Sequence, residues 1–238
     1  MHIPKNAGTS VESALLEQRS CTESRPCKGR TWDRSPPLLH ATSAEYQRAC
    51  NATLFHSVPS AAILRRPLDR ERSMYLYFSS GGNGSPDDLR KFASIRALHK
   101  AHGARLGFQE FVERLAQENE SWTQEILFRP QSEFVLHGRI VDDAESAISV
   151  TWLLCTERLS NDWEALQRAL PALRKFALPS KPKRASAPSE ALQTALDTPT
   201  PRTLHILEED PFFTSDNHLW NRHCVVTAQC CVLHQGLG

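Results

Sequence analysis

Apolar residues recur at helical spacing in several segments of the chain. Within 108–119, Phe108, Phe111, Val112 and Leu115 repeat at intervals of three and four residues, which places them on one face of a helix. Capping residues mark the starts of other such segments, as at Thr9. The pattern predicts helices at 9–19, 42–50, 69–78, 88–102, 108–119, 161–170, 189–196 and 216–223.

Two short apolar runs lack this spacing and predict buried strands. They lie at Val58–Arg65 and Ser149–Thr156, and continuous apolar runs of this kind are typical of strands covered on both faces. The residues His2-Ile3-Pro4-Lys5 have the pattern of a third strand at its end. Because a strand usually has about 5–6 residues, we expect the chain to begin inside this element.

Strands that alternate with helices predict an α/β fold with a mostly parallel central sheet flanked by helices. We expect a single P-loop-like domain over residues 1–223, with its first strand truncated. Residues 179–188 are rich in Pro and Lys and predict a linker or loop within that domain. The tail over 224–238 carries no readable signal.

The composition excludes some partners. The 28 basic and 27 acidic side chains give a net charge of +1, which predicts neither a nucleic-acid nor an acidic-membrane partner. Any anion site must therefore be built locally. No apolar run approaches the roughly 20 residues of a membrane helix, and nothing in the sequence indicates an oligomeric state.

The seven cysteines are irregularly spaced. Cys21 and Cys27 flank a loop-like stretch, and they either form a disulfide in a secretory compartment or remain thiols; the two readings have equal weight. Cys230 and Cys231 are adjacent, which is poor geometry for a mutual bridge. Because no C-x-x-C pair occurs, no zinc site is predicted.

The segment from Ile3 to Ser10 has the pattern of a strand end, a loop of small residues and a helix start. Such a junction directs backbone N–H groups and a helix N-terminus at one point, which suits a phosphate or sulfate. Gly8 allows close approach of the backbone, Thr9 and Ser10 add hydroxyl groups, and Lys5 adds a positive charge. An ordinary capped helix after a loop is an alternative of equal weight.

Lys5 precedes Gly8, whereas the Walker loop of kinases and NTPases places its Lys after the last Gly. The segment instead resembles the 5′-phosphosulfate loop of sulfotransferases that use 3′-phosphoadenosine 5′-phosphosulfate (PAPS). When His2 is included, the segment from His2 to Ser10 is most similar to the Golgi carbohydrate sulfotransferases of the heparan sulfate, galactose and chondroitin types. The resemblance implies that the phosphosulfate is bound by Lys5, Asn6, Ala7, Gly8, Thr9 and Ser10.

A second segment, Ile63–Tyr75, again has the pattern of strand, turn and helix, and it resembles the 3′-phosphate motif of the same family. The resemblance implies that Arg65 and Ser73 bind the 3′-phosphate, since Arg can grip phosphate through two hydrogen bonds. Arg66 replaces the usual Asp of that motif. The alternative is a surface salt-bridge cluster, because acidic and basic residues alternate here: Arg65, Arg66, Asp69, Arg70, Glu71 and Arg72.

Three further segments extend the likeness. Phe128–Ser132 resembles an Arg-Pro-Gln segment of the family, Leu154–Trp163 resembles its late strand and following helix, and Phe213–Asp216 is weakly similar to its last helix. The resemblance implies a sulfotransferase fold with PAPS as co-substrate, a glycan acceptor and no metal. It also implies a Golgi location, with the family's N-terminal membrane anchor missing from this chain.

Transfer to a hydroxyl needs a group that takes the acceptor's proton, and His is the usual base at neutral pH. His40 follows Leu39 between the two nucleotide motifs, as a His does in several carbohydrate sulfotransferases, and is our candidate. A loop-fixing role for His40 has equal weight. Glu12 is a weaker alternative base. Lys5 is the candidate for neutralising charge on the leaving phosphate.

The resemblance thus predicts a PAPS-dependent sulfotransferase that transfers a sulfuryl group to a hydroxyl of a carbohydrate. A catalytically inactive nucleotide-binding remnant is one alternative, because Arg66 and the short first strand depart from the family. A P-loop kinase or nucleotide hydrolase is a weaker one, because Gly8 occupies the position that its Lys requires.

Overall fold

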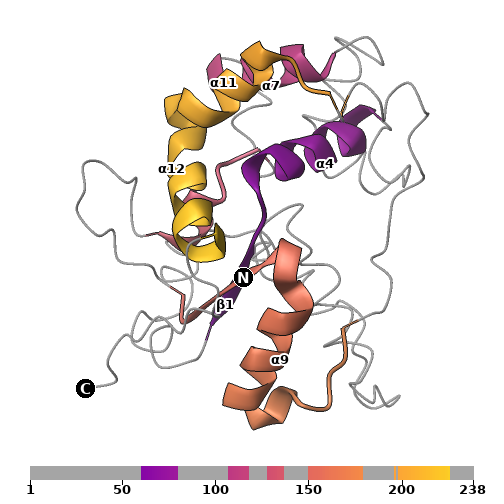
Figure 1. Cartoon of the computed structure of the whole chain (residues 1–238), viewed down its shortest axis with the longest axis vertical. Coiled ribbons are helices and arrows are strands. Elements are labelled where there is room, and N and C mark those ends of the chain that lie inside the picture. The colour runs from indigo at the N-terminus through magenta and orange to yellow at the C-terminus, as the bar shows by residue number, and fades with distance from the viewer. Residues whose placement is uncertain are drawn as a thin grey trace, which may run out of the picture. The chain divides into compact units, whose positions relative to one another are not determined.

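The described part of the chain contains two parallel strands, six α-helices, two 3₁₀ helices and one π-helical segment, and Figure 1 shows their arrangement along the chain. The computed structural model describes residues 60–79, 107–117, 128–136, 150–178, 196 and 198–225. In chain order the elements are β1 (Ala61–Leu64), α4 (Pro67–Ser79), α7 (Phe108–Gln117), α8 (Ser132–Val135), β2 (Trp152–Cys155), the 3₁₀ helix η3 (Thr156–Arg158), α9 (Leu159–Ala169), the 3₁₀ helix η4 (Pro171–Leu173), α11 (Pro201–Glu209), α12 (Pro211–Trp220) and the π-helical segment η5 (Asn221–Val225).

The described residues divide into two compact units. The strand unit contains residues 60–65, 131–136, 150–178 and 219–225. The helical unit contains residues 66–79, 107–117, 128–130, 196 and 198–218. The predicted single domain over 1–223 stays a prediction.

The strand unit is built on the parallel pairing of β1 with β2. Leu64 pairs with Cys155 at the last position of the register and Ala61 with Trp152 at the first. Before the first pair, the Ser60 N–H donates to Thr151 Oγ1 at 3.2 Å and the Thr151 N–H donates to Ser60 Oγ at 3.3 Å. All four residues of β2 are buried, as expected for a parallel strand covered on both faces. The parallel arrangement of these two strands confirms the predicted mixed α/β class.

Helix α9 packs against the sheet through its apolar face. Trp163 and Leu166 cluster with Ile63, Trp152 and Leu154 in one buried group. Their spacing of three residues on α9 is the helical pattern that the sequence shows.

Side chains of α9 form hydrogen bonds with the backbone of the segment that follows the helix, residues 170–176. The Trp163 indole N–H donates to the Phe176 carbonyl at 3.0 Å. The Gln167 amide donates to the carbonyls of Leu173, at 3.0 Å, and Phe176, at 2.6 Å. These contacts give side-chain partners to carbonyl groups of η4 and the turn after it, and the Leu173 carbonyl also accepts the Phe176 N–H at 2.9 Å.

The helical unit has an aromatic core. The ring of Tyr75 on α4 lies 5.5 Å from that of Phe108 and 5.6 Å from that of Phe111, and the rings of Phe111 and Phe128 are 6.1 Å apart. Burial of Phe108, Phe111, Val112 and Leu115 on α7 confirms the predicted apolar face. Such tilted aromatic pairs add to the stabilisation from buried apolar area.

Five predicted elements are confirmed, with shifted ends: β1, α4, α7, β2 and α9. Both strands are shorter than the apolar runs that predicted them. Helices α4 and α9 begin two residues earlier than predicted. The helices predicted at 9–19, 42–50 and 88–102, the linker over 179–188 and most of the helix predicted at 189–196 lie outside the described residues.

The structure corrects the prediction near the C-terminus. Helix α11 was not predicted, although Thr200-Pro201 is a start signal: the Thr200 side chain accepts the Thr203 N–H at 3.2 Å, and Pro201 takes the first helical position. The helix predicted at 216–223 is wrong in its bounds. Helix α12 begins at Pro211, where Asp210 accepts the Phe212 N–H at 2.9 Å, and the chain turns into η5 after Trp220.

A disulfide between Cys155 and Cys224 joins the end of β2 to η5. The two cysteines are 69 residues apart in sequence, with Cα atoms 5.8 Å apart. Sequence spacing gave no signal for this pair. Cys21, Cys27, Cys230 and Cys231 lie outside the described residues.

We expect the variant C155A/C224A to lose stability, because the bridge restricts the unfolded chain over a long loop. A loop of this size corresponds to about 4 kcal/mol of free energy of unfolding by chain entropy alone. Urea denaturation of the oxidised wild type and the double variant measures the difference. A non-reducing peptide map of the wild type is the control for the 155–224 link, and a difference below about 1 kcal/mol would contradict the expectation.

Candidate functional site

The candidate site begins at the turn between β1 and α4. The apolar strand ends at Leu64 and the two charged residues Arg65 and Arg66 follow, before Pro67 opens the helix (Figure 1). Pro suits this first helical position because its missing N–H has no partner there in any helix. The Arg70 N–H donates to the Arg66 carbonyl at 2.9 Å. The strand-turn-helix pattern therefore forms although Arg66 replaces the expected Asp.

The backbone of Arg65 is held by one side-chain amide in the strand unit. Gln131 Oε1 accepts the Arg65 N–H at 3.2 Å, and Gln131 Nε2 donates to the Arg65 carbonyl at 2.8 Å. Gln131 is fully buried. The turn and the Arg-Pro-Gln segment, which the sequence could relate only by resemblance, are thus in direct contact.

The helical unit contains a buried ion pair on α4. Arg70 Nη1 lies 2.7 Å from Glu71 Oε1, and the two side chains are 1% and 2% exposed. Arg70 Nη2 also donates to the Arg129 carbonyl at 2.7 Å. Arg70 therefore connects α4 to the residue before Pro130 in the Arg-Pro-Gln segment.

A second ion pair on α4 lies nearer the surface. Arg72 Nη1 is 3.1 Å from Asp69 Oδ1, one helical turn away. Both acidic residues of the motif thus pair with Arg70 and Arg72. Both arginines therefore form salt bridges, as the alternative reading predicts, but only the Arg72–Asp69 pair lies near the surface, because the Arg70–Glu71 pair is buried.

Two of the predicted binding residues are described. Arg65 is half-buried just beyond β1, and Ser73 is half-buried in the second turn of α4. The other predicted binding residues and the two candidate bases lie outside the described residues: Lys5, Asn6, Ala7, Gly8, Thr9 and Ser10, and the bases His40 and Glu12. A common cleft for Lys5 and Arg65 stays a prediction.

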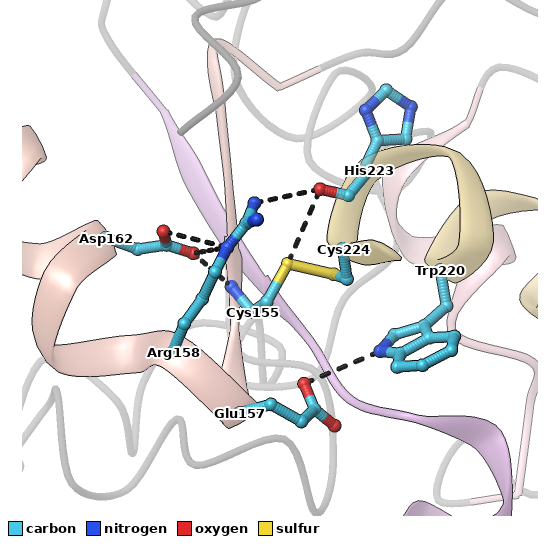
Figure 2. Close-up of polar contacts among 7 residues, drawn as sticks. All are labelled: Cys155, Glu157, Arg158, Asp162, Trp220, His223 and Cys224. Atoms are coloured by element: carbon cyan, nitrogen blue, oxygen red, sulfur yellow. Dashed lines mark hydrogen bonds and ion pairs between the residues drawn. A yellow bond between two sulfur atoms is a disulfide. The ribbon is translucent and has the colours of Figure 1, made fainter. Parts of the chain in front are cut away.

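A second polar cluster surrounds the disulfide at the end of β2 (Figure 2). Asp162 Oδ2 accepts the Cys155 N–H at 2.8 Å, and Asp162 Oδ1 lies 3.0 Å from Arg158 Nε. Arg158 Nη2 donates to the His223 carbonyl at 2.9 Å. These bonds join β2, α9 and η5 beside the Cys155–Cys224 bridge, so the cluster has a structural role.

Burial shifts the pKa of two side chains among those described. Desolvation lowers the pKa of His223, and the positive charge of Arg222 lowers it further. Both effects favour the neutral imidazole. Burial raises the pKa of the Tyr75 hydroxyl, which therefore stays protonated at neutral pH.

Neither a metal centre nor a membrane span is found in the part of the chain that the structure describes. Its His, Cys, Asp and Glu side chains form no group of three that could hold a metal ion. None of its helices is long and apolar enough to cross a bilayer.

Comparison with known proteins returns no relative: the chain matches no protein-family model, no curated protein and no solved structure. The residues themselves are therefore the basis for a functional proposal.

We expect R70M to lose about 3–5 kcal/mol of stability, because it removes one partner of a buried ion pair and leaves the Glu71 carboxylate in the interior. The double variant R70M/E71M should recover much of the loss, since the carboxylate is removed too. Urea denaturation measures both variants.

The matched control is R114A. Arg114 pairs with Glu110 at 2.7 Å on α7, but these side chains are 24% and 47% exposed, so the loss should stay near 0.5 kcal/mol or less. Equal losses for R70M and R114A would show that burial of the Arg70 pair has no energetic consequence.

Proposed function

We propose that this chain is a PAPS-dependent sulfotransferase that transfers a sulfuryl group to a hydroxyl of a carbohydrate, and that its α/β fold is the sulfotransferase fold. The observation that carries the proposal is the pair of anion motifs in family order. The second of them is a strand-turn-helix in which Gln131 of a third family-like segment holds the backbone of Arg65.

The position of Arg65 supports a binding role. Parallel strands end at the same edge of a sheet, and ligands of open α/β sheets bind outside the carboxyl ends of the strands. Leu64 is the last residue of β1, and it pairs with Cys155, the last residue of β2. Arg65 follows Leu64 directly. A guanidinium at this edge is a suitable partner for a phosphate.

The proposed reaction divides the work among few groups. The loop at Lys5–Ser10 binds the 5′-phosphosulfate, and Arg65 with Ser73 binds the 3′-phosphate. The acceptor oxygen forms a bond to sulfur as the bond from sulfur to the bridging phosphate oxygen breaks. His40 takes the proton of the hydroxyl, and Lys5 neutralises the charge that develops on the leaving phosphate. Positioning and charge compensation are the main requirements, as in phosphoryl transfer.

The disulfide supports the compartment that the proposal implies. Cys155–Cys224 is a bridge of the kind that persists in oxidising compartments and is rare in the cytosol. A location in the Golgi lumen fits this requirement.

A second candidate function is nucleotide binding without turnover. It is favoured by Arg66, which is exposed in the turn where the family places an Asp. A chain that binds the nucleotide and forms no sulfated product would fit this candidate.

We expect the wild type to bind adenosine 3′,5′-bisphosphate, and we expect K5A and R65A each to weaken binding by about tenfold to a hundredfold, because a hydrogen bond to a charged group contributes about 1.5–3 kcal/mol. Calorimetry measures the affinities. The matched control is R174A, an exposed arginine of the strand unit, which should bind like the wild type. Absence of binding by the wild type would overturn the proposal.

We expect H40A to keep its affinity for the bisphosphate and to lose turnover by about 10²–10⁴-fold, the usual contribution of a general base. Sulfation of a glycan panel with PAPS measures turnover, and calorimetry on the same preparation controls for binding. Unchanged turnover would exclude His40 as the base.

A further inference from the structure

We infer that Gln131 is a positioning residue for nucleotide binding: its amide fixes the backbone of Arg65 and so sets how the guanidinium meets a 3′-phosphate. The inference rests on the proposed function and adds to it a residue that binds no ligand itself.

The first observation is the two-point contact. Gln131 bonds both the N–H and the carbonyl of Arg65, at 3.2 and 2.8 Å. These two groups lie on either side of one Cα atom, so the contact restricts both backbone dihedral angles of Arg65. A neighbouring strand would offer the same pair of bonds to a residue inside a sheet.

The second observation is the position at which the contact occurs. Pairing of β1 with β2 ends at Leu64 and Cys155, so Arg65 is the first residue beyond the register. The β1–β2 hydrogen bonds restrain the backbone as far as Leu64, and Gln131 restrains it for one residue more, at Arg65, whose side chain is proposed to bind phosphate.

The third observation is that Gln131 is buried although its side chain does not cap the helix that it precedes. It is the N-cap residue of α8 but makes no side-chain capping bond, and Gln is not among the preferred N-cap residues. It is nevertheless fully buried, where an amide needs hydrogen-bond partners. The Arg65 backbone supplies both of the partners described above.

A long side chain magnifies small rotations at its Cα atom, and misplacement of a binding group by about 1 Å can cost two orders of magnitude in function. Loss of the amide should therefore weaken recognition of the 3′-phosphate. The 5′ end of the nucleotide, which the proposal assigns to the Lys5 loop, should be bound as before.

The test compares two nucleotides that differ only in the 3′-phosphate. For each protein, we define the 3′-phosphate ratio as the dissociation constant of adenosine 5′-monophosphate divided by that of adenosine 3′,5′-bisphosphate. We expect Q131M, which keeps the side-chain length but has no amide, to lower this ratio about tenfold while the affinity for the 5′-monophosphate is unchanged.

A second variant keeps the test decisive if Q131M does not fold. In Q131E, the ionised side chain can accept the Arg65 N–H but cannot donate to its carbonyl, whereas the protonated carboxylic acid can do both. The 3′-phosphate ratio of Q131E, divided by that of the wild type at the same pH, should therefore rise toward one as the pH is lowered. A purely structural role predicts no such rescue of the ratio.

The matched control is Q167M. Gln167 also bonds two backbone groups of the strand unit, but these are the carbonyls of Leu173 and Phe176 and not the backbone of Arg65. This variant should leave the 3′-phosphate ratio at the wild-type value.

The outcomes separate the inference from the proposed function. If the wild type binds neither nucleotide, or binds both equally, the proposed function fails and this inference fails with it. If R65A lowers the 3′-phosphate ratio to one while Q131M and Q131E keep the wild-type ratio, the inference alone is overturned. Equal weakening of both nucleotides by Q131M also overturns it, because the residue would then support the fold and not the 3′-phosphate contact.

Discussion

The parallel pairing of β1 with β2 is the interaction on which the strand unit depends. It joins Ser60 and Thr151, which are 91 residues apart, so the entropy of closing a long loop opposes it. Burial of the strands beneath α9 offsets that cost. Both ends of β2 are also secured. Before its first residue, the backbone N–H groups of Ser60 and Thr151 each donate to the other residue's hydroxyl oxygen, and at its last residue Cys155 forms the disulfide. A fixed register in turn defines where each strand ends and which residues stand at the sheet edge.

Side chains complete the backbone hydrogen bonding where the strands and helices end. Gln131 bonds the backbone beyond β1, Arg70 bonds a carbonyl before α8, and Asp162 bonds the last N–H of β2. Backbone groups at such ends have no partner within their own element, and leaving them buried without one is costly. The same bonds hold the turns in one conformation, which suits a binding site that must present charged groups at fixed positions.

The proposed function places a doubly phosphorylated nucleotide on a chain with a net charge of only +1. Overall charge therefore cannot supply the attraction, and recognition must come from a few cations and N–H groups held in place. The segment Ile63–Tyr75 is consistent with this requirement. Its acidic residues Asp69 and Glu71 pair with Arg72 and Arg70, and the backbone of Arg65 is bonded by the neutral amide of Gln131, which adds no competing charge.

The sequence by itself determined the elements whose signals are local: the apolar runs of β1 and β2, the apolar face of α7, and the strand-turn-helix order around Arg65. The start of α11 also has a local capping signal at Thr200, but the apolar periodicity did not predict this helix. Only the tertiary structure decided the contact of Gln131 with Arg65, the burial of Arg70 and the pairing of Cys155 with its distant partner. The physical reason is that capping and periodicity depend on neighbours in sequence, whereas these contacts depend on which distant segments the chain packs together.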